Sequence, residues 1–416
     1  MVEPVEAMAT FEALNHLSSI ASIPALFWNL KSASIDVKNS NDLVYCMRKL
    51  PTSLDDLTVN FHCRRHGDMS GDLAINAVYD WLYEAATLKK LILKGRVPWI
   101  NNANLRGCHR ALRSLTSVNT LWIEHHMLDD TTLDILSRWP KLKTLCIQPD
   151  RGAVPNLRLG KMGETTVGRF GALRQLMLSA SSTSLAQILS VLPGDLRLLI
   201  MCAVFHSPAM NDELEAMCAA LSKTSPNLEI LDVHLRGEAF VAAQLGTLCF
   251  GSIGKLKSCS RLRSFLFSNN ALVSFEFGAA DLDWVGAHWP KLRVFTCCWA
   301  QARKCTSGGV GLQSPALLDL EAVSTMAANL KELRSVSVTQ LMICEPKMLR
   351  TVKHSLLSVS VHYVYHESVH QAAHAWCLLC PEATIKVTCP AHAKEWKSVE
   401  QAKSEVTERR GVVGLP

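Results

Sequence analysis

Long uninterrupted apolar segments are missing from this chain of 416 residues. Its apolar stretches are short and broken by polar residues, so we expect no segment to span a bilayer. The N-terminus, MVEPVEAMATFEALNHL, carries acids where a secretory signal needs positive charge, and no apolar run follows them. We therefore expect an intracellular protein, cytoplasmic or nuclear, that makes no membrane contact.

Catalytic motifs are missing as well. The sequence contains no P-loop, no dinucleotide-binding glycine fingerprint, no His-Glu-x-x-His and no nucleophile elbow. Residues 308–311, GGVG, are rich in glycine but lack the Lys-Ser/Thr pair of a phosphate-binding loop, so we interpret them as an insertion loop. We expect a protein that is not an enzyme and needs no cofactor.

Charge of one sign is only weakly in excess, with a net charge of +6 and a pI near 8.6. That is milder than a dedicated nucleic-acid-binding protein usually shows. One stretch, residues 85–123, has no acid and seven basic residues: Lys89, Lys90, Lys94, Arg96, Arg106, Arg110 and Arg113. It could attract an acidic protein or nucleic acid. Because few aromatic residues lie between these cations, we interpret the stretch as the solvated face of ordinary repeats and do not expect a nucleic-acid partner.

Disulfide-type spacing is absent although cysteine is abundant. The fifteen cysteines are odd in number and irregularly placed, so we expect most of them to fill a reduced core. One set could bind zinc, because Cys377-x-x-Cys380 is followed by Cys389-x-x-His392. We favour a structural role for these four residues and expect no metal, since the cysteine pair lies where a helix meets Pro381.

What the sequence does have is a repeat. Its pattern of six residues is an apolar residue, two variable residues, an apolar residue, one variable residue and another apolar residue. Successive copies begin mostly 23 to 34 residues apart and are more widely spaced toward residue 333. The clear copies begin at Leu54, Leu88, Val118, Leu142, Leu173, Leu196, Leu228, Leu262, Leu292, Leu333 and Leu356. A weak first copy begins at Leu30, and a weak last copy ends in Ile385 and Val387. Spacing in this range is typical of leucine-rich repeats, in which the alternating part is a short strand.

The segments between these copies have helical patterns. Residues 129–139, 181–192, 211–221 and 281–289 are amphipathic and begin with capping or acidic residues. In the first of them, Asp130 or Thr131 could cap a helix that buries Leu133, Leu136 and Trp139. Alternation of strand and helix predicts an α/β fold: an irregular leucine-rich-repeat solenoid, or horseshoe, with an inner parallel sheet and outer helices.

Several of these segments carry a family resemblance. Residues 26–32 (LFWNLKS), residues 50–54 (LPTSL) and the phrase WPKL at 139–142 and 289–292 resemble the leucine-rich-repeat region of F-box proteins of mushroom-forming (basidiomycete) fungi. The resemblance covers about residues 20 to 390. It implies an adaptor that recognises substrates for a ubiquitin ligase and contacts cullin-type ligase subunits.

The sequence departs from that family in two ways. The Asn that commonly follows the strand is replaced, and these positions hold His62, Arg96, His126, Asp150 and Ser181. No F-box is visible either, because that helical domain needs more chain than the 29 residues before Leu30. We expect a flank or cap over residues 1–29, the solenoid over 30–390 and a charged helical tail over 391–416.

The expected binding surface is the concave face, formed by strand residues that alternate with the buried ones. The residues chosen as the partner-binding set are Lys90, Ile92, Lys94, Trp122, Glu124, Gln148, Met177, Ile200, Asp232 and His234. Ile92, Trp122, Met177 and Ile200 would form an apolar stripe with a polar rim, and Trp is a typical binding hot spot. The sequence therefore predicts a non-catalytic scaffold for a protein partner. The alternatives are a basic binding module and a degenerate paralogue without binding activity.

Overall fold

The computed structural model describes most of the chain and its side chains. The described residues are 29–37, 40–61, 72–95, 102–124, 129–148, 169–206, 209–237, 248–269, 275–299, 318–344, 354–366 and 368–413. The glycine-rich residues 308–311, four of the five replaced Asn positions and nearly all of the expected N-terminal flank lie outside these ranges. The fifth position, Ser181, caps a helix.

The chain forms two compact units. The first comprises Met1–Ala180 with Val191–Pro193, and the second comprises Ser181–Ser190 with Gly194–Pro416. Each unit repeats one motif, a short strand followed by a return segment that is mostly helical. Each is described by itself below.

The first unit contains six strands and four helices among its described residues. The strands are β1 (Ser32–Val37), β2 (Asp56–Phe61), β3 (Lys90–Gly95), β4 (Thr120–Glu124), β5 (Thr144–Gln148) and β6 (Gln175–Ser181). The helices are α2 (Ser40–Lys49), α3 (Asp72–Glu84), α4 (Asn102–Ser114) and α5 (Asp130–Ser137). Every neighbouring strand pair is parallel.

The second unit continues the same alternation. Its main strands are β7 (Leu198–Phe205), β8 (Ile230–Gly237), β10 (Ser264–Asn269), β12 (Val294–Trp299), β13 (Ser335–Ile343), β14 (Ser358–His366) and β15 (Thr384–Val387), again parallel at each neighbouring pair. A short second sheet pairs β9 (Leu248–Cys249) with β11 (Phe275–Glu276). The helices are α6 (Ser182–Leu189), α7 (Met210–Thr224), η3 (Phe250–Ser258), α9 (Ala279–His288), α10 (Leu320–Asn329), α11 (Val369–Leu379) and α12 (Pro390–Val413).

The register of the strands stacks equivalent leucines on one another. In the first unit Leu91 pairs with Leu121, and Leu121 pairs with Leu145. In the second unit Phe265 pairs with both Leu231 and Phe295. All of these side chains are buried. Each such side chain contributes about 1.5–3 kcal/mol when it leaves water, so the repeated pattern itself sets the register.

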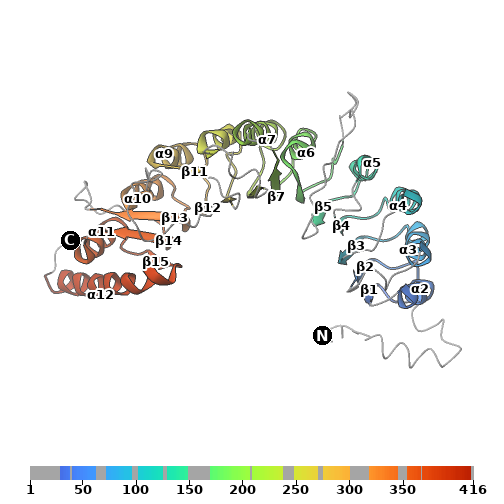
Figure 1. The fold of residues 1–416 in the computed structure, drawn as a ribbon, viewed down its shortest axis with the longest axis horizontal. Coiled ribbons are helices and arrows are strands. Elements are labelled where there is room, and N and C mark those ends of the chain that lie inside the picture. Colours follow the sequence, from blue (N-terminus) through green and yellow to red (C-terminus); the bar gives the residue numbers. More distant parts are fainter. Residues whose placement is uncertain are drawn as a thin grey trace. The chain divides into compact units, whose positions relative to one another are not determined.

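Within each unit the helices pack side by side on the sheet face toward which these apolar residues point (Figure 1). The predicted fold class, an α/β leucine-rich-repeat solenoid with a parallel sheet and a helical layer, is confirmed. No helix in the described part is long and apolar enough to cross a membrane.

The caps of the helices differ in one place from expectation. The N-cap of α5 is Asp129, whose carboxylate accepts a 2.7 Å hydrogen bond from the amide of Thr132. The prediction of Asp130 or Thr131 as the cap was therefore wrong, because both lie inside the first helical turn. The expected burial of Leu133 and Leu136 is confirmed.

Tryptophans at the ends of return helices tie successive repeats together. The indole nitrogen of Trp139 donates to the carbonyl of Leu112 at 3.0 Å, and that of Trp289 donates to the carbonyl of Leu256 at 3.3 Å. Both tryptophans belong to the repeated WPKL phrase and both are buried. The phrase therefore combines a helix end with a hydrogen bond to the preceding repeat.

Candidate functional site

The sheet of each unit has one face that the helices do not cover, and we call it the open face. Its side chains alternate along each strand with the buried ones. In the first unit two rows of these side chains run across the strands. The first row holds Lys90, Thr120, Thr144 and Gln175, and the second holds Ile92, Trp122, Cys146 and Met177. A polar first row therefore lies beside an apolar second row.

The second row is continuous from β3 to β6. Ile92 pairs with Trp122, Trp122 with Cys146, and Cys146 with Met177. The sulfur atoms of Cys146 and Met177 lie 3.3 Å apart. Cys146 is 4% exposed, whereas its three neighbours in the row are partly exposed. Neighbouring strands lie about 4.8 Å apart, so the side chains of the row adjoin one another and present a single apolar strip to a partner.

A cation lies over the aromatic ring in this row. The ammonium of Lys94 is 4.3 Å from the centre of the Trp122 ring. This contact contributes about 0.5–1 kcal/mol at an exposed site and orients the indole. Trp122 thus presents its face beside a fixed positive charge.

The predicted binding residues fall into three groups. Lys90, Ile92, Lys94, Trp122 and Met177 all lie on the open face of the first unit and are partly exposed. Glu124 and Gln148 pair with each other through their backbones at the ends of β4 and β5, while their side chains lie outside the described part. The remaining three belong to the second unit: Ile200, Asp232 and His234.

In the second unit, an ion pair joins two of the predicted residues. Nε2 of His234 lies 3.0 Å from Oδ1 of Asp232, two residues away on the same strand. The hydrogen bond with Asp232 raises the pKa of His234 above its ordinary value, although partial burial opposes the shift. Ile200 pairs with Asp232 across β7 and β8, so the charged pair borders an apolar side chain.

The predicted partner-binding set omits several residues of the open faces. Cys146 lies in the second row of the first unit but is not part of the predicted set. In the second unit Leu198, Ile230, Leu266 and Val294 also lie on the open face, and Ile230 and Val294 are 38% and 37% exposed. The alternating strand pattern predicts an outward direction for Leu198 and Ile230, whereas Leu266 and Val294 lie beyond residue 240, where the sequence does not define the repeat register.

The basic stretch at 85–123 does not form one patch. Lys90 and Lys94 lie on the open face, whereas Lys89 precedes β3 and forms a 3.0 Å ion pair with Asp55. Arg110, on α4, pairs with Asp80 at 2.8 Å and stacks on the Tyr83 ring. Arg106 and Arg113 are exposed on the same helix, and Arg96 lies outside the described part. The sequence cluster is divided among three surfaces.

The cysteine and histidine set near the C-terminus is also spread out. The thiol of Cys377 faces the carbonyl of Lys403, and Nδ1 of His392 lies 2.9 Å from the carbonyl of Val364. Cys380 is fully buried, and burial raises the pKa of its thiol to about 12, which disfavours the thiolate that zinc needs. Across the described ranges, no three His, Cys, Asp or Glu side chains are placed to share a metal ion.

Most of the other described cysteines fill the core, as the sequence predicts. No disulfide joins the cysteines within the described ranges. Burial raises the pKa of Cys108 to about 12 and that of Cys259 to about 11, so both stay as neutral thiols. These residues act as small apolar side chains.

Comparison with known proteins gives likeness of fold at low identity. No protein-family profile matches this chain. No curated protein matches it either. Among solved structures, a chain of the yeast Rad7–Elc1 complex is 13% identical, with a TM-score of 0.36, over 82% of this chain and 83% of its own length.

Two bacterial proteins are similar at the same level. The leucine-rich-repeat protein LegL7 of Legionella pneumophila is 13% identical, with a TM-score of 0.30, over 92% of this chain and 95% of its own. The leucine-rich-repeat protein LIC12759 of Leptospira interrogans is 10% identical, with a TM-score of 0.34, over 86% and 90%. The assignment of the fold rests on the strand register and burial described above.

Proposed function

We propose that this protein is a non-catalytic interaction scaffold that binds a protein partner on the open face of its first unit. The observation that supports the proposal is the apolar second row, which contains Trp122 and has a polar row on one side and Lys94 on the other. An apolar centre with a polar rim is the usual anatomy of a protein interface.

Trp122 and Met177 are the side chains that should contribute most to binding. Tryptophan is enriched at hot spots, where truncation to alanine costs about 2 kcal/mol or more. Methionine adapts to irregular partner surfaces. Lys94 would add a charge that selects a partner with an acid near its apolar contact.

A finer proposal concerns the kind of scaffold. We infer an adaptor that recognises substrates for a ubiquitin ligase and contacts cullin-type subunits. Its support is the sequence resemblance to fungal F-box repeat proteins, carried by residues 26–32, 50–54 and the two WPKL phrases. Contact with the ligase is therefore a separate claim from binding on the open face.

The test is affinity capture of the tagged chain from its own cells, with bound proteins quantified by mass spectrometry. The test variant is Trp122→Ala with Met177→Ala, and the matched control is Tyr83→Ala. Tyr83 is also in the first unit, is 49% exposed and carries a cation on its ring, but it lies on α3, away from the open face. We expect the double variant to lose at least about tenfold in partner recovery, since that loss corresponds to about 1.4 kcal/mol.

The outcomes separate the readings. The open-face proposal is contradicted if the double variant and the Tyr83→Ala control lose the same proteins, or if neither variant loses any. Cullin-type subunits in the capture support the adaptor role, and their absence together with other open-face partners removes it while the scaffold stands. A capture with no specific protein favours a degenerate paralogue.

A further inference from the structure

A second surface of the molecule carries a row of arginines. Arg263, Arg293 and Arg334 each stand immediately before a strand of the second unit, at the starts of β10, β12 and β13. Their backbones are joined in register: the amide of Arg293 donates to the carbonyl of Arg263 at 2.7 Å, and that of Arg334 donates to Arg293 at 2.8 Å. We call these three residues the arginine row.

The repeat explains why their side chains face solvent. The residue before each arginine is a leucine that is fully buried: Leu262, Leu292 and Leu333. The chain is extended at this point, so the side chains that flank each leucine point away from the core. The side chains of Arg263 and Arg293 are 50% and 54% exposed.

The row lies in the most cationic part of the described second unit. The short turns that lead into the same three strands add Arg261, Lys291 and Lys331, all exposed, and a single acid, Glu332. The turns before these three strands thus hold six cations and one carboxylate, and a second carboxylate, Glu229, precedes the neighbouring strand β8. The whole chain has a net charge of only +6. Strands lie about 4.8 Å apart, which concentrates this charge on one edge.

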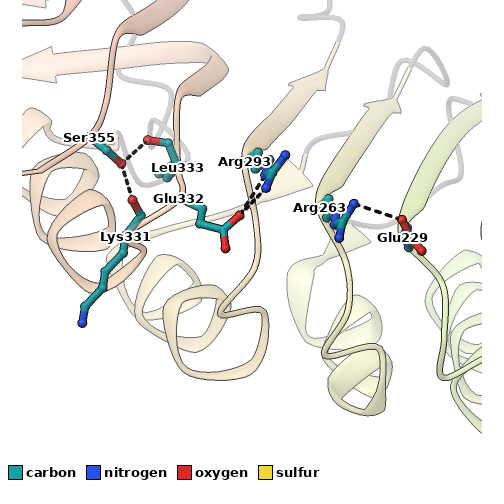
Figure 2. A network of polar contacts seen from close by, with 7 residues as sticks. All are labelled: Glu229, Arg263, Arg293, Lys331, Glu332, Leu333 and Ser355. Carbon is teal, nitrogen blue, oxygen red and sulfur yellow. Dashed lines mark hydrogen bonds and ion pairs between the residues drawn. The ribbon is translucent and has the colours of Figure 1, made fainter.

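Two carboxylates of the chain itself already bind to the row. Oε2 of Glu332 accepts a 2.8 Å hydrogen bond from Nε of Arg293 and forms an ion pair with its Nη2, also at 2.8 Å (Figure 2). On the other side Glu229 lies 3.4 Å from Nη1 of Arg263. The hydrogen bonds and charge of Arg293, followed by the charges of Arg263 and Lys291, hold the pKa of Glu332 below its ordinary value.

These contacts use only part of the donor capacity. Each guanidinium has five N–H donors. Glu332 accepts one hydrogen bond from Nε of Arg293, and the carbonyl of Ser355 accepts one from Nη1 of Arg334 at 3.2 Å. The hydroxyl of Ser355 lies 2.7 Å from the carbonyl of Lys331 and 2.8 Å from that of Leu333, so its one hydrogen is shared between two carbonyls of the turn that precedes the arginine (Figure 2).

We propose that the arginine row is a second binding surface, which takes an aspartate- or glutamate-rich segment of a protein partner. Its own glutamates illustrate the mode of binding, because each places a carboxylate against a guanidinium group of the row. Exposed Val294 adjoins Arg293 and provides an apolar contact suited to a polypeptide. The strand residues that follow the row, Ser264, Val294 and Ser335, include no aromatic ring on which single-stranded nucleic acid could stack.

The test measures binding of a fluorescein-labelled oligoglutamate peptide to the full chain by fluorescence anisotropy. The test variant is Arg263→Gln, Arg293→Gln, Arg334→Gln. The matched control is Lys89→Gln, Lys143→Gln, Arg174→Gln, which removes three charges at the equivalent positions of the first unit, before β3, β5 and β6. We expect the dissociation constant to rise about tenfold or more in the test variant and about twofold in the control, because the control removes the same number of charges without removing a guanidinium of the arginine row.

A third variant and a second probe complete the test. Replacing the three arginines by lysine keeps the charge but removes the planar fork, and we expect an intermediate loss. Equal weakening in the test and control variants, no binding by the wild type, or tighter binding of an oligouridylate of matched charge would each overturn the proposal. Melting curves verify that every variant folds. The Trp122→Ala, Met177→Ala variant should bind oligoglutamate like the wild type, so this surface can fail or stand independently of the first.

Discussion

Removing the indole of Trp289 should destabilise the second unit by an amount that the structure allows us to divide. This fully buried side chain donates to the carbonyl of Leu256 at 3.3 Å. Its ring centre lies 4.8 Å from that of Phe265 and 5.3 Å from that of Trp284. The substitutions Trp289→Phe and Trp289→Ala remove these contacts in two steps.

The first step removes the hydrogen bond and part of the ring. The carbonyl of Leu256 keeps a 3.0 Å bond from the amide of Cys259, so it is not left without a partner. The bond itself is therefore worth about 0.5–1.5 kcal/mol, and with the lost ring volume we expect Trp289→Phe to cost about 1–3 kcal/mol. The alanine variant also loses the aromatic packing and leaves a cavity, for a total of about 3–5 kcal/mol.

The assay is urea unfolding followed by far-ultraviolet circular dichroism, with the free energy of unfolding compared among variants. Trp122→Phe is the control, because its ring is partly exposed on the open face and should change stability by no more than about 0.5 kcal/mol. The reasoning is refuted if Trp289→Phe lies as close to the wild type as this control, or if alanine costs no more than phenylalanine.

Two titratable residues give further predictions. Asp129→Ala removes the cap of α5 and should cost about 1 kcal/mol. Burial opposes ionisation of Asp129, but hydrogen bonds from Thr132 and His109 hold its pKa below the ordinary value. The contribution of Asp129 to stability is therefore present above the ordinary pKa and is lost as the pH falls through the folded pKa. The melting temperatures of wild type and variant should converge in acid. For His234, the bond with Asp232 raises the pKa, so its contribution is present below the ordinary value and is lost as the pH rises through the folded pKa. His234→Gln should therefore cost most stability in mild acid, and an unshifted histidine titration by nuclear magnetic resonance would contradict the ion pair.

The strands could be predicted from the sequence because burial repeats with a fixed phase. Leu91, Leu121 and Leu145 each stand at the same place in the pattern, and the structure stacks them in one buried column. A register slip of one residue would turn these leucines to solvent, so the apolar pattern alone determines the pairing. The outward direction of Trp122 follows from the same phase.

The cap of α5 could not be chosen in the same way. Asp129, Asp130 and Thr131 are consecutive and any of them can cap a helix. The choice depends on which residue has an extended backbone, and Asp129 does, with φ −125° and ψ 177°. That backbone conformation is set by the chain before the helix, so the residue types alone do not reveal it.

The arginine row could not be seen for a different reason. Charge counted along the sequence points to residues 85–123, which the fold divides among an edge, a sheet face and a helix. Arg263, Arg293 and Arg334 are separated by whole repeats and look isolated until the register is known. In a solenoid the density of charge along the sequence differs from its density in space, because residues that are neighbours in space are one repeat apart in the sequence.

The energies of burial and of charge repulsion explain why the arginine row can exist and why it favours an acidic ligand. Like charges directly opposite each other on neighbouring strands are destabilising by roughly 0.2–1 kcal/mol. Burial of Leu262, Leu292 and Leu333 contributes about 1.5–3 kcal/mol each, so the core wins and fixes the register despite the repulsion. Glu332 relieves the repulsion at Arg293, while Arg334 bonds only to a neutral carbonyl among the contacts that the structure gives for its side chain. Carboxylates supplied by a partner would relieve what is left, and this gain comes without any rearrangement of the sheet.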